Sequence, residues 1–88
     1  LNADPEALRA LIEAGKIHSR QGKDKVAQAS FRKATRSHPR SGEAWCLLGL
    51  SLAQRKVSRE ARQALQKCRD GDGPGDLVDS ANELLDAR

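Results

Sequence analysis

The stretch AWCLLGLSLAQ, residues 44–54, places a glycine in the middle of a run of apolar, helix-forming residues. A glycine in the interior of a helix costs about 1 kcal/mol relative to alanine. The chain's only tryptophan, Trp45, lies four residues before this glycine, Gly49. We therefore expect a contact with another part of the chain that compensates for the missing side chain at Gly49.

The rest of the chain also has the sequence pattern of helices. Apolar residues recur at helical spacing, while aromatic residues make up only 2% of the chain and no alternating pattern indicates a strand. We expect helices over residues 5–20, 24–38, 42–55, 59–69 and 76–88, with a break at DGDGPG, residues 70–75. The predicted N-terminal caps are Asp4 (followed by Pro5), Ser41, Ser58 and Asp76.

A single shift along the sequence aligns the first half of the chain with the second. When Gly15 is placed on Gly49, Ala27 falls on Ala61. The other matched pairs are Leu11 with Trp45, Ala14 with Leu48, Phe31 with Leu65 and Ala34 with Cys68. Tetratricopeptide repeats are helix–turn–helix units of about 34 residues with a Trp, a Leu-Gly shortly after it and a small Ala in the second helix. Over residues 5–73 the chain therefore resembles the tetratricopeptide repeat (TPR) family.

The resemblance implies an all-α fold of five helices, in which antiparallel helix pairs stack as a short right-handed solenoid. Repeat 1 covers residues 5–40 and repeat 2 covers residues 41–73, while residues 76–88 do not repeat and are expected to form a capping helix. Residues 1–88 are then a single domain. Because the chain begins at Leu1 and contains no methionine, we interpret it as a fragment of a longer protein.

The resemblance also supplies an interpretation of Gly49. Paired TPR helices approach each other closely, so a side chain on Gly15 or Gly49 would push the partner helix away, and Trp45 is expected in the core. The chain departs from the family pattern at Leu11 (in place of Trp), His18 (in place of an aromatic residue), Lys56 (in place of the turn glycine) and Pro74 (one residue late).

Residues that carry chemistry are few, and we expect no enzyme activity, no cofactor and no metal. Cys46 and Cys68 form no Cys-X-X-Cys motif, and we expect two free thiols in a reducing compartment. His18 and His38 lie far apart in the sequence, and His18 is expected to be partly buried with its hydrogen bonds satisfied. The acidic loop that begins at residue 70 lacks calcium ligands, because Pro74 and Ala81 occupy ligand positions.

In TPR proteins the first helix of each pair lines a concave groove. Carried over by position, this implies a groove lined by Arg9, Ile12, Lys16, Ser19, Arg20, Glu43, Cys46, Leu50, Ala53 and Gln54. The candidate partner-binding residues are Arg9, Ile12, Lys16, Arg20, Cys46, Leu50 and Gln54. Ile12 and Leu50 occupy positions that the family's chaperone-tail clamp gives to polar residues, so we do not expect that ligand. An apolar segment with acidic neighbours, bound as a helix or an extended peptide, fits better.

The function that follows is that of a protein–protein interaction scaffold module without catalysis. Residues 1–69 hold fifteen lysines and arginines against six acids, while residues 70–88 hold one arginine against six acids. Two alternatives stay open: a self-association module, and a nucleic-acid adaptor that uses a basic convex face. This convex face would carry Lys25, Arg32, Lys33, Arg36, Arg59, Arg62 and Lys67. The scarcity of aromatic residues argues against nucleic acid. No apolar run is long enough to span a membrane, and we expect a cytoplasmic protein.

Overall fold

The computed structural model describes residues 4–54 and 56–86, and these residues form five helices and no strand. The helices are α1 (Pro5–Arg20), α2 (Asp24–Ser37), α3 (Gly42–Leu52), α4 (Arg59–Asp70) and α5 (Gly75–Asp86). The predicted all-α class is therefore confirmed.

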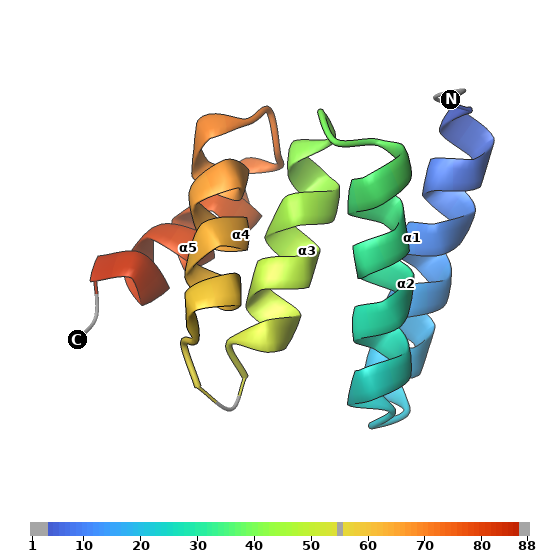
Figure 1. Cartoon of the computed structure of the whole chain (residues 1–88), viewed down its shortest axis with the longest axis horizontal. Helices are drawn as coiled ribbons and strands as arrows, with labels where there is room; N and C mark the ends of the chain where they lie inside the picture. Colours follow the sequence, from blue (N-terminus) through green and yellow to red (C-terminus); the bar gives the residue numbers. More distant parts are fainter. Residues whose placement is uncertain (1–3, 55, 87–88) are drawn as a thin grey trace.

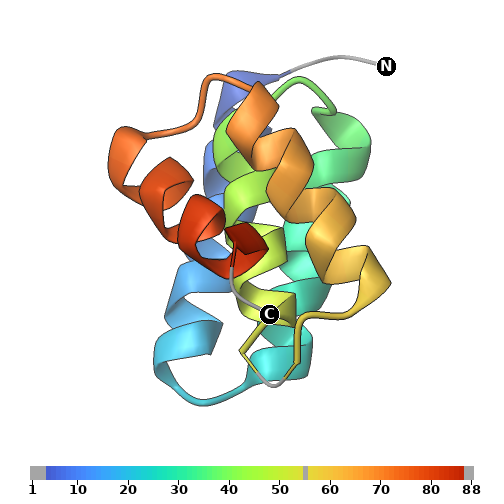
Figure 2. The ribbon, with the colours of Figure 1, turned by 90° about the vertical axis from the view of Figure 1, so that its left-hand side faces the viewer.

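The first four helices stand side by side and run alternately in opposite directions (Figure 1). Neighbours in sequence pack against each other, so that α2 lies between α1 and α3, and α3 lies between α2 and α4. The last helix, α5, crosses the end of this row at an angle and packs against both α3 and α4 (Figure 2). The α1–α2 pair and α5 thus lie at opposite ends of the molecule's long axis.

Side-chain caps begin three of the helices where the sequence predicts them. Ser41 and Ser58 each accept a hydrogen bond from the amide three residues later, at 3.2 Å in both cases. Asp4 accepts a hydrogen bond from the amide of Glu6 at 3.0 Å. The fourth predicted cap is wrong: α5 begins at Gly75, so Asp76 lies in its first turn. The third helix is also shorter than predicted, because the chain turns directly after Leu52.

The core consists of two apolar clusters. The first joins α2, α3 and α4 through the buried residues Ala27, Phe31, Leu48 and Ala64. The second joins α3, α4 and α5 through Cys46, Leu65, Cys68 and Ala81. Around the second cluster pack the apolar residues of α5, which are Leu77, Val78, Leu84 and Leu85. The apolar stripe of the last helix therefore packs against α3 and α4, with Ala81 fully buried and the four larger side chains partly buried.

The close approach expected at the two interior glycines is confirmed. A Cβ atom on Gly49 would lie 2.8 Å from Cδ2 and 3.0 Å from the backbone nitrogen of Leu65. A Cβ atom on Gly15 would overlap the ring of Phe31 in the same way. The shift that places Gly15 on Gly49 also places Phe31 on Leu65. The sequence repeat is thus also a repeat of helix–helix contacts.

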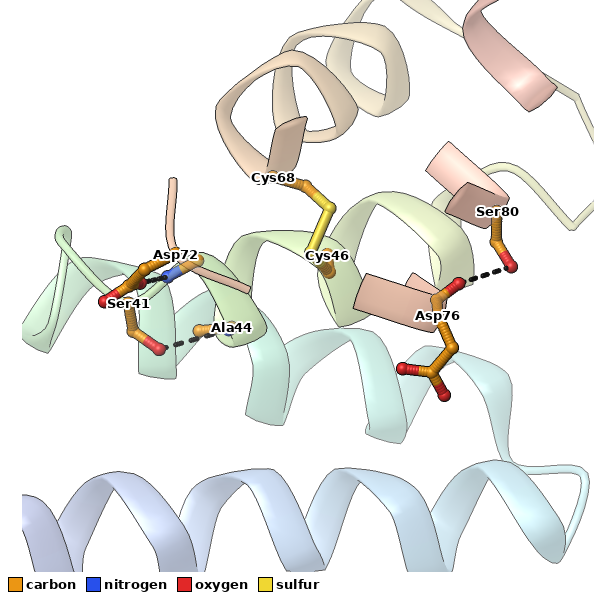
Figure 3. The surroundings of a disulfide bond; sticks show 8 residues. Ser41, Ala44, Cys46, Cys68, Asp72, Asp76 and Ser80 are labelled. Carbon is orange, nitrogen blue, oxygen red and sulfur yellow. Dashed lines mark hydrogen bonds between the residues drawn. A yellow bond between two sulfur atoms is a disulfide. The ribbon is translucent and has the colours of Figure 1, made fainter. Parts of the chain in front are cut away.

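The two cysteines form a disulfide bond, so the prediction of two free thiols is wrong (Figure 3). Antiparallel packing of α3 and α4 brings the Cα atoms of Cys46 and Cys68 to 4.5 Å, although 22 residues separate them in sequence. Both side chains are completely buried. We expected a reducing compartment because we expected free thiols. Disulfide bonds are rare in the reducing cytosol, so the Cys46–Cys68 bond no longer supports that expectation.

Trp45 is less buried than predicted. Its side chain packs against both core clusters but remains partly exposed. The indole Nε1 donates a hydrogen bond to the carbonyl oxygen of Pro39 at 2.8 Å, and the Lys67 ammonium lies 4.8 Å from the ring centroid. Trp45 therefore stands at the boundary of the core, where Lys67 covers part of its ring.

Candidate functional site

A surface hollow of about 260 Å³ lies between α1 and α3, the first helices of the two antiparallel pairs. It is lined by Lys16, Ser19 and Arg20 of α1, Phe31 of α2, and Leu47, Leu50, Ser51 and Gln54 of the third helix and the turn that follows it. Four of the seven predicted partner-binding residues meet here: Lys16, Arg20, Leu50 and Gln54. We call this the α1–α3 hollow.

The lining of the α1–α3 hollow combines apolar and positively charged side chains. Phe31, Leu47 and Leu50 supply the apolar part, and Leu50 also packs against the second core cluster. Arg20 is exposed and makes no ion pair with any residue that the structure describes. The hollow therefore offers an apolar surface with an unneutralised cation beside it.

An ion pair between α1 and α3 borders the hollow. The Nζ atom of Lys16 lies 3.7 Å from a carboxylate oxygen of Glu43, and both side chains are more than one-third exposed. Such exposed pairs contribute about 0–1 kcal/mol to stability, because water screens them. Lys16 is thus held beside the hollow by a weak, solvent-screened interaction with Glu43.

Three predicted partner-binding residues lie outside this hollow. Arg9 and Ile12 line a separate, smaller hollow with Leu8 and Glu43. Ile12 is only 4% exposed, which contradicts the expectation that it lies open in the groove. Cys46 is fully buried by its disulfide bond and by Ala81 of α5, so it offers no surface to a partner. Both errors arise because family positions alone do not show which side chains the neighbouring helices cover.

The sequence prediction also missed residues of the hollow. Leu47 and Ser51 line it from α3, and Phe31 reaches it from α2. We predicted Phe31 only as a core residue. A buried side chain can nevertheless form part of the wall of a hollow, as Phe31 does here. Ser51 is buried and faces α2, since it also lines a small hollow with Gln28 of that helix.

The predicted basic face on α2 and α4 is partly neutralised within the molecule. Arg32 forms two hydrogen bonds to one carboxylate oxygen of Glu60, at 2.8 and 3.2 Å. Lys67 lies over the ring of Trp45. Exposed cations remain at Lys25, Lys33, Arg36, Arg59 and Arg62. This face is thus less uniformly positive than the sequence indicates.

His18 also differs from its prediction. Its Nδ1 atom is buried and has no hydrogen-bond partner among the described residues, whereas a satisfied imidazole was expected. His38, by contrast, donates from Nε2 to the carbonyl oxygen of Asp4 at 3.0 Å. Neither histidine belongs to a cluster of three or more metal-binding side chains, and the described residues contain no such cluster.

No protein-family profile, no curated protein and no solved structure matches this chain. The resemblance to TPR proteins therefore rests on the repeated residues themselves. In the part of the chain that the structure describes, no helix has the length and apolar character required to cross a membrane.

Proposed function

We propose that this chain is a TPR-type protein-binding module that holds a short segment of a partner protein in the α1–α3 hollow. The observation that carries the proposal is the composition of that hollow, in which Lys16 and Arg20 lie beside an apolar lining that includes Leu47 and Leu50. Catalysis is not part of the proposal.

The stacking expected of TPR repeats is supported by the equivalent contacts of Gly15 with Phe31 and of Gly49 with Leu65. In such a stack the first helices of successive pairs lie on one side, where α1 and α3 border the hollow. Since both pairs repeat the same internal packing, α1 and α3 present equivalent sides to a ligand.

The chemistry of the ligand follows from the lining. An apolar side chain of the partner would contact Leu47 and Leu50, while a neighbouring carboxylate would pair with Arg20 and displace Glu43 from Lys16. Helical and extended peptides both present such an anchor with flanking acids. We therefore propose a partner segment in which Leu or Phe stands next to Asp or Glu.

A binding assay with defined peptides tests this proposal. The probes are fluorescent peptides that carry a Leu or Phe flanked by Asp or Glu, and the readout is fluorescence polarisation. Lys16→Glu combined with Arg20→Glu should weaken binding by about 1–3 kcal/mol, because charge reversal places like charges opposite each other. The matched control is Lys33→Glu combined with Arg36→Glu, which changes the net charge equally on α2. An equal loss in both variants, or no binding by any peptide of this class, would reject the hollow as the site.

Nucleic acid on the α2–α4 face is the weaker candidate. The exposed cations of this face favour nucleic-acid binding. However, Arg32 is paired with Glu60, and the Lys67 ammonium lies over the ring of Trp45. Binding to phosphates weakens steeply as salt rises, because counterions are released. A salt titration with single-stranded RNA therefore separates this candidate from the peptide site, whose apolar contacts depend little on salt.

A further inference from the structure

The disulfide bond between α3 and α4 is closed off from solvent. Cys46 and Cys68 are both 0% exposed, and they share the second core cluster with Leu65 and Ala81. Apart from residues of α3, of the turn after it and of α4, every member of this cluster belongs to α5. This last helix crosses the end of the α3–α4 pair (Figure 2). A thiol from solution can therefore reach either sulfur only after this cover has moved.

The loop that leads into α5 also lies against the bond. A Cβ atom on Gly73 would lie 2.8 Å from the Sγ atom of Cys46, so only a glycine lets the backbone pass this closely. The same loop is tied to the start of α3, because the amide of Gly42 donates a hydrogen bond to Asp72 at 3.3 Å. The cover over the bond thus consists of a tethered loop and of α5, which begins directly after that loop.

Apolar contacts alone hold α5 in place. Among the residues that the structure describes, no hydrogen bond and no ion pair joins α5 to α3 or α4. Of its apolar side chains, Ala81 is fully buried, and the larger ones are only partly buried, namely Leu77, Val78, Leu84 and Leu85. An element with few buried contacts opens locally at a lower free-energy cost than the core does. We therefore expect α5 to undock while the other helices stay folded.

The charges of α5 weaken it further. Its exposed acids follow one another at spacings of three and four residues, at which like charges destabilise a helix. These acids are Asp76, Asp79, Glu83 and Asp86. The last turn contains no basic residue that would complement the negative end of the helix dipole. With 12 residues, α5 also has a length at which an isolated helix is only marginally stable. It depends on its docking to remain helical.

From these observations we infer that α5 is a redox-sensitive lid over the Cys46–Cys68 bond, whose undocking admits a dithiol reductant. A thiolate of the reductant attacks one cysteine sulfur, the S–S bond breaks, and the other cysteine leaves as a thiolate that takes up a proton. The second thiol of the reductant then displaces the first cysteine from the mixed disulfide. The reductant ends as a disulfide, and the protein has gained two electrons and two protons as two thiols.

Reduction in turn leaves the lid open. Two thiol sulfurs that are no longer bonded must move apart, and the site has no space for this, because both side chains are completely buried and Gly73 lies against Cys46. Overpacking of a filled core forces its neighbours to shift. The neighbour held least firmly is α5, whereas α3 and α4 are also held by the first core cluster. Neither step requires a ligand in the α1–α3 hollow.

The rate of reduction in urea tests whether the bond is reached by local opening. The wild-type chain is treated with dithiothreitol at constant pH, below the unfolding transition, and its thiols are counted by alkylation and mass spectrometry. The slope of the logarithm of the rate against urea reports how much surface the reactive opening exposes. We expect a slope well below the equilibrium m-value of unfolding. A slope equal to that m-value would overturn the lid, because the bond is then reached only by global unfolding.

Truncation of one lid side chain gives a second test. Leu84→Ala removes part of the apolar contact that holds α5, so reduction by dithiothreitol should become about tenfold faster. The matched control is Leu8→Ala, the same truncation of a partly buried leucine on α1, which should leave the rate unchanged. Circular dichroism verifies that both variants are folded. No acceleration in Leu84→Ala, or equal acceleration in the control, would rule out α5 as the gate.

Hydrogen exchange of the wild-type chain tests the effect of reduction on the lid. Amides of α5 should lose protection in dithiothreitol, while amides of α2 keep theirs, and oxidised dithiothreitol serves as the control reagent. Protection that survives in α5 after complete reduction would contradict the inference. Equal loss of protection in α2 and α5 would contradict it as well, since the bond would then support the whole fold rather than the docking of one helix.

Discussion

At the scale of single residues, Gly15 and Gly49 show why a helix-weakening residue recurs at the equivalent position of both helix pairs. Each removes a Cβ atom that would collide with a large buried side chain of the following helix, Phe31 or Leu65. Burying such a side chain contributes roughly 1.5–3 kcal/mol, which exceeds the cost of about 1 kcal/mol for an interior glycine. The net effect is favourable because the burial of Phe31 or Leu65 contributes more than the helical glycine costs.

Replacing one of these glycines should therefore destabilise the fold. We expect Gly49→Ala to lower the free energy of unfolding by about 1–3 kcal/mol, since the new Cβ overpacks against Leu65. Gly75→Ala is the control, because a Cβ there meets no atom within 4 Å. Urea denaturation measures both variants. An unchanged midpoint for Gly49→Ala would mean that α3 and α4 do not approach as closely as described.

The buried nitrogen of His18 gives a second prediction at this scale. A buried polar atom without a partner costs about 1–3 kcal/mol, so His18→Phe should raise the free energy of unfolding by about 1 kcal/mol. His38→Phe should lower it, because His38 donates to the carbonyl oxygen of Asp4. Thermal melts of the two variants compare one unsatisfied and one satisfied imidazole. A loss of stability in His18→Phe would show that Nδ1 of His18 has a partner after all.

At the scale of elements, α3 holds the molecule together. It packs against α2, α4 and α5, and a disulfide bond joins it to α4 (Figure 3). The two cysteines share a buried cluster with Ala81 of α5. A hydrogen bond joins the loop after α4 to the start of α3. The backbone amide of Gly42 donates it to a carboxylate oxygen of Asp72 at 3.3 Å. The acidic last helix, α5, is thus positioned by its packing against both α3 and α4.

Removing the disulfide bond should weaken this arrangement measurably. Cys46→Ala with Cys68→Ala releases a loop of 22 residues in the unfolded chain, which on the chain-entropy account costs about 3 kcal/mol of stability. A reducing agent should produce a similar loss in the wild-type chain and none in the double variant. If the reducing agent leaves the urea midpoint of the wild-type chain unchanged, the two thiols are not joined in solution.

At the scale of the whole molecule, the first core cluster couples the two helix pairs. Phe31 of α2 lies between Gly15 of α1 and the residues Leu48 and Ala64 of the second pair. The free energy of unfolding of a native protein is about 5–15 kcal/mol in total. The contribution of one large buried side chain such as Phe31 is therefore a large fraction of it. The molecule should accordingly unfold in one cooperative step.

Truncating Phe31 tests this coupling. We expect Phe31→Ala to cost about 3–5 kcal/mol and to separate the unfolding of α1–α2 from that of the other helices. The matched control is Val26→Ala on the same helix, where the side chain is about half exposed and the expected change is small. Hydrogen exchange of the amides reports both pairs at once. Uniform exchange throughout Phe31→Ala would contradict the coupling role.

By itself, the sequence determined the features that depend on local chemistry. Ser41, Ser58 and Asp4 cap helices because a side-chain oxygen needs only an amide two or three residues away. The repeated glycines were also predictable, since their spacing is visible in the sequence and the cost of a helical glycine demands a contact. Of the candidate site, Lys16, Arg20, Leu50 and Gln54 were found by carrying over the groove positions that the resemblance to TPR proteins implies.

Only the tertiary structure decided the features that depend on how helices are rotated and spaced. Cys46 and Cys68 meet because the side of α3 that carries Cys46 packs against the side of α4 that carries Cys68. The residues next to each cysteine in the sequence do not indicate this pairing. Ile12 is buried and Ile17 is open, although both are isoleucines of one helix, because burial depends on which neighbouring helix stands beside each turn. Capping and periodicity act over one or two turns, whereas these contacts join residues brought together only when the chain has folded.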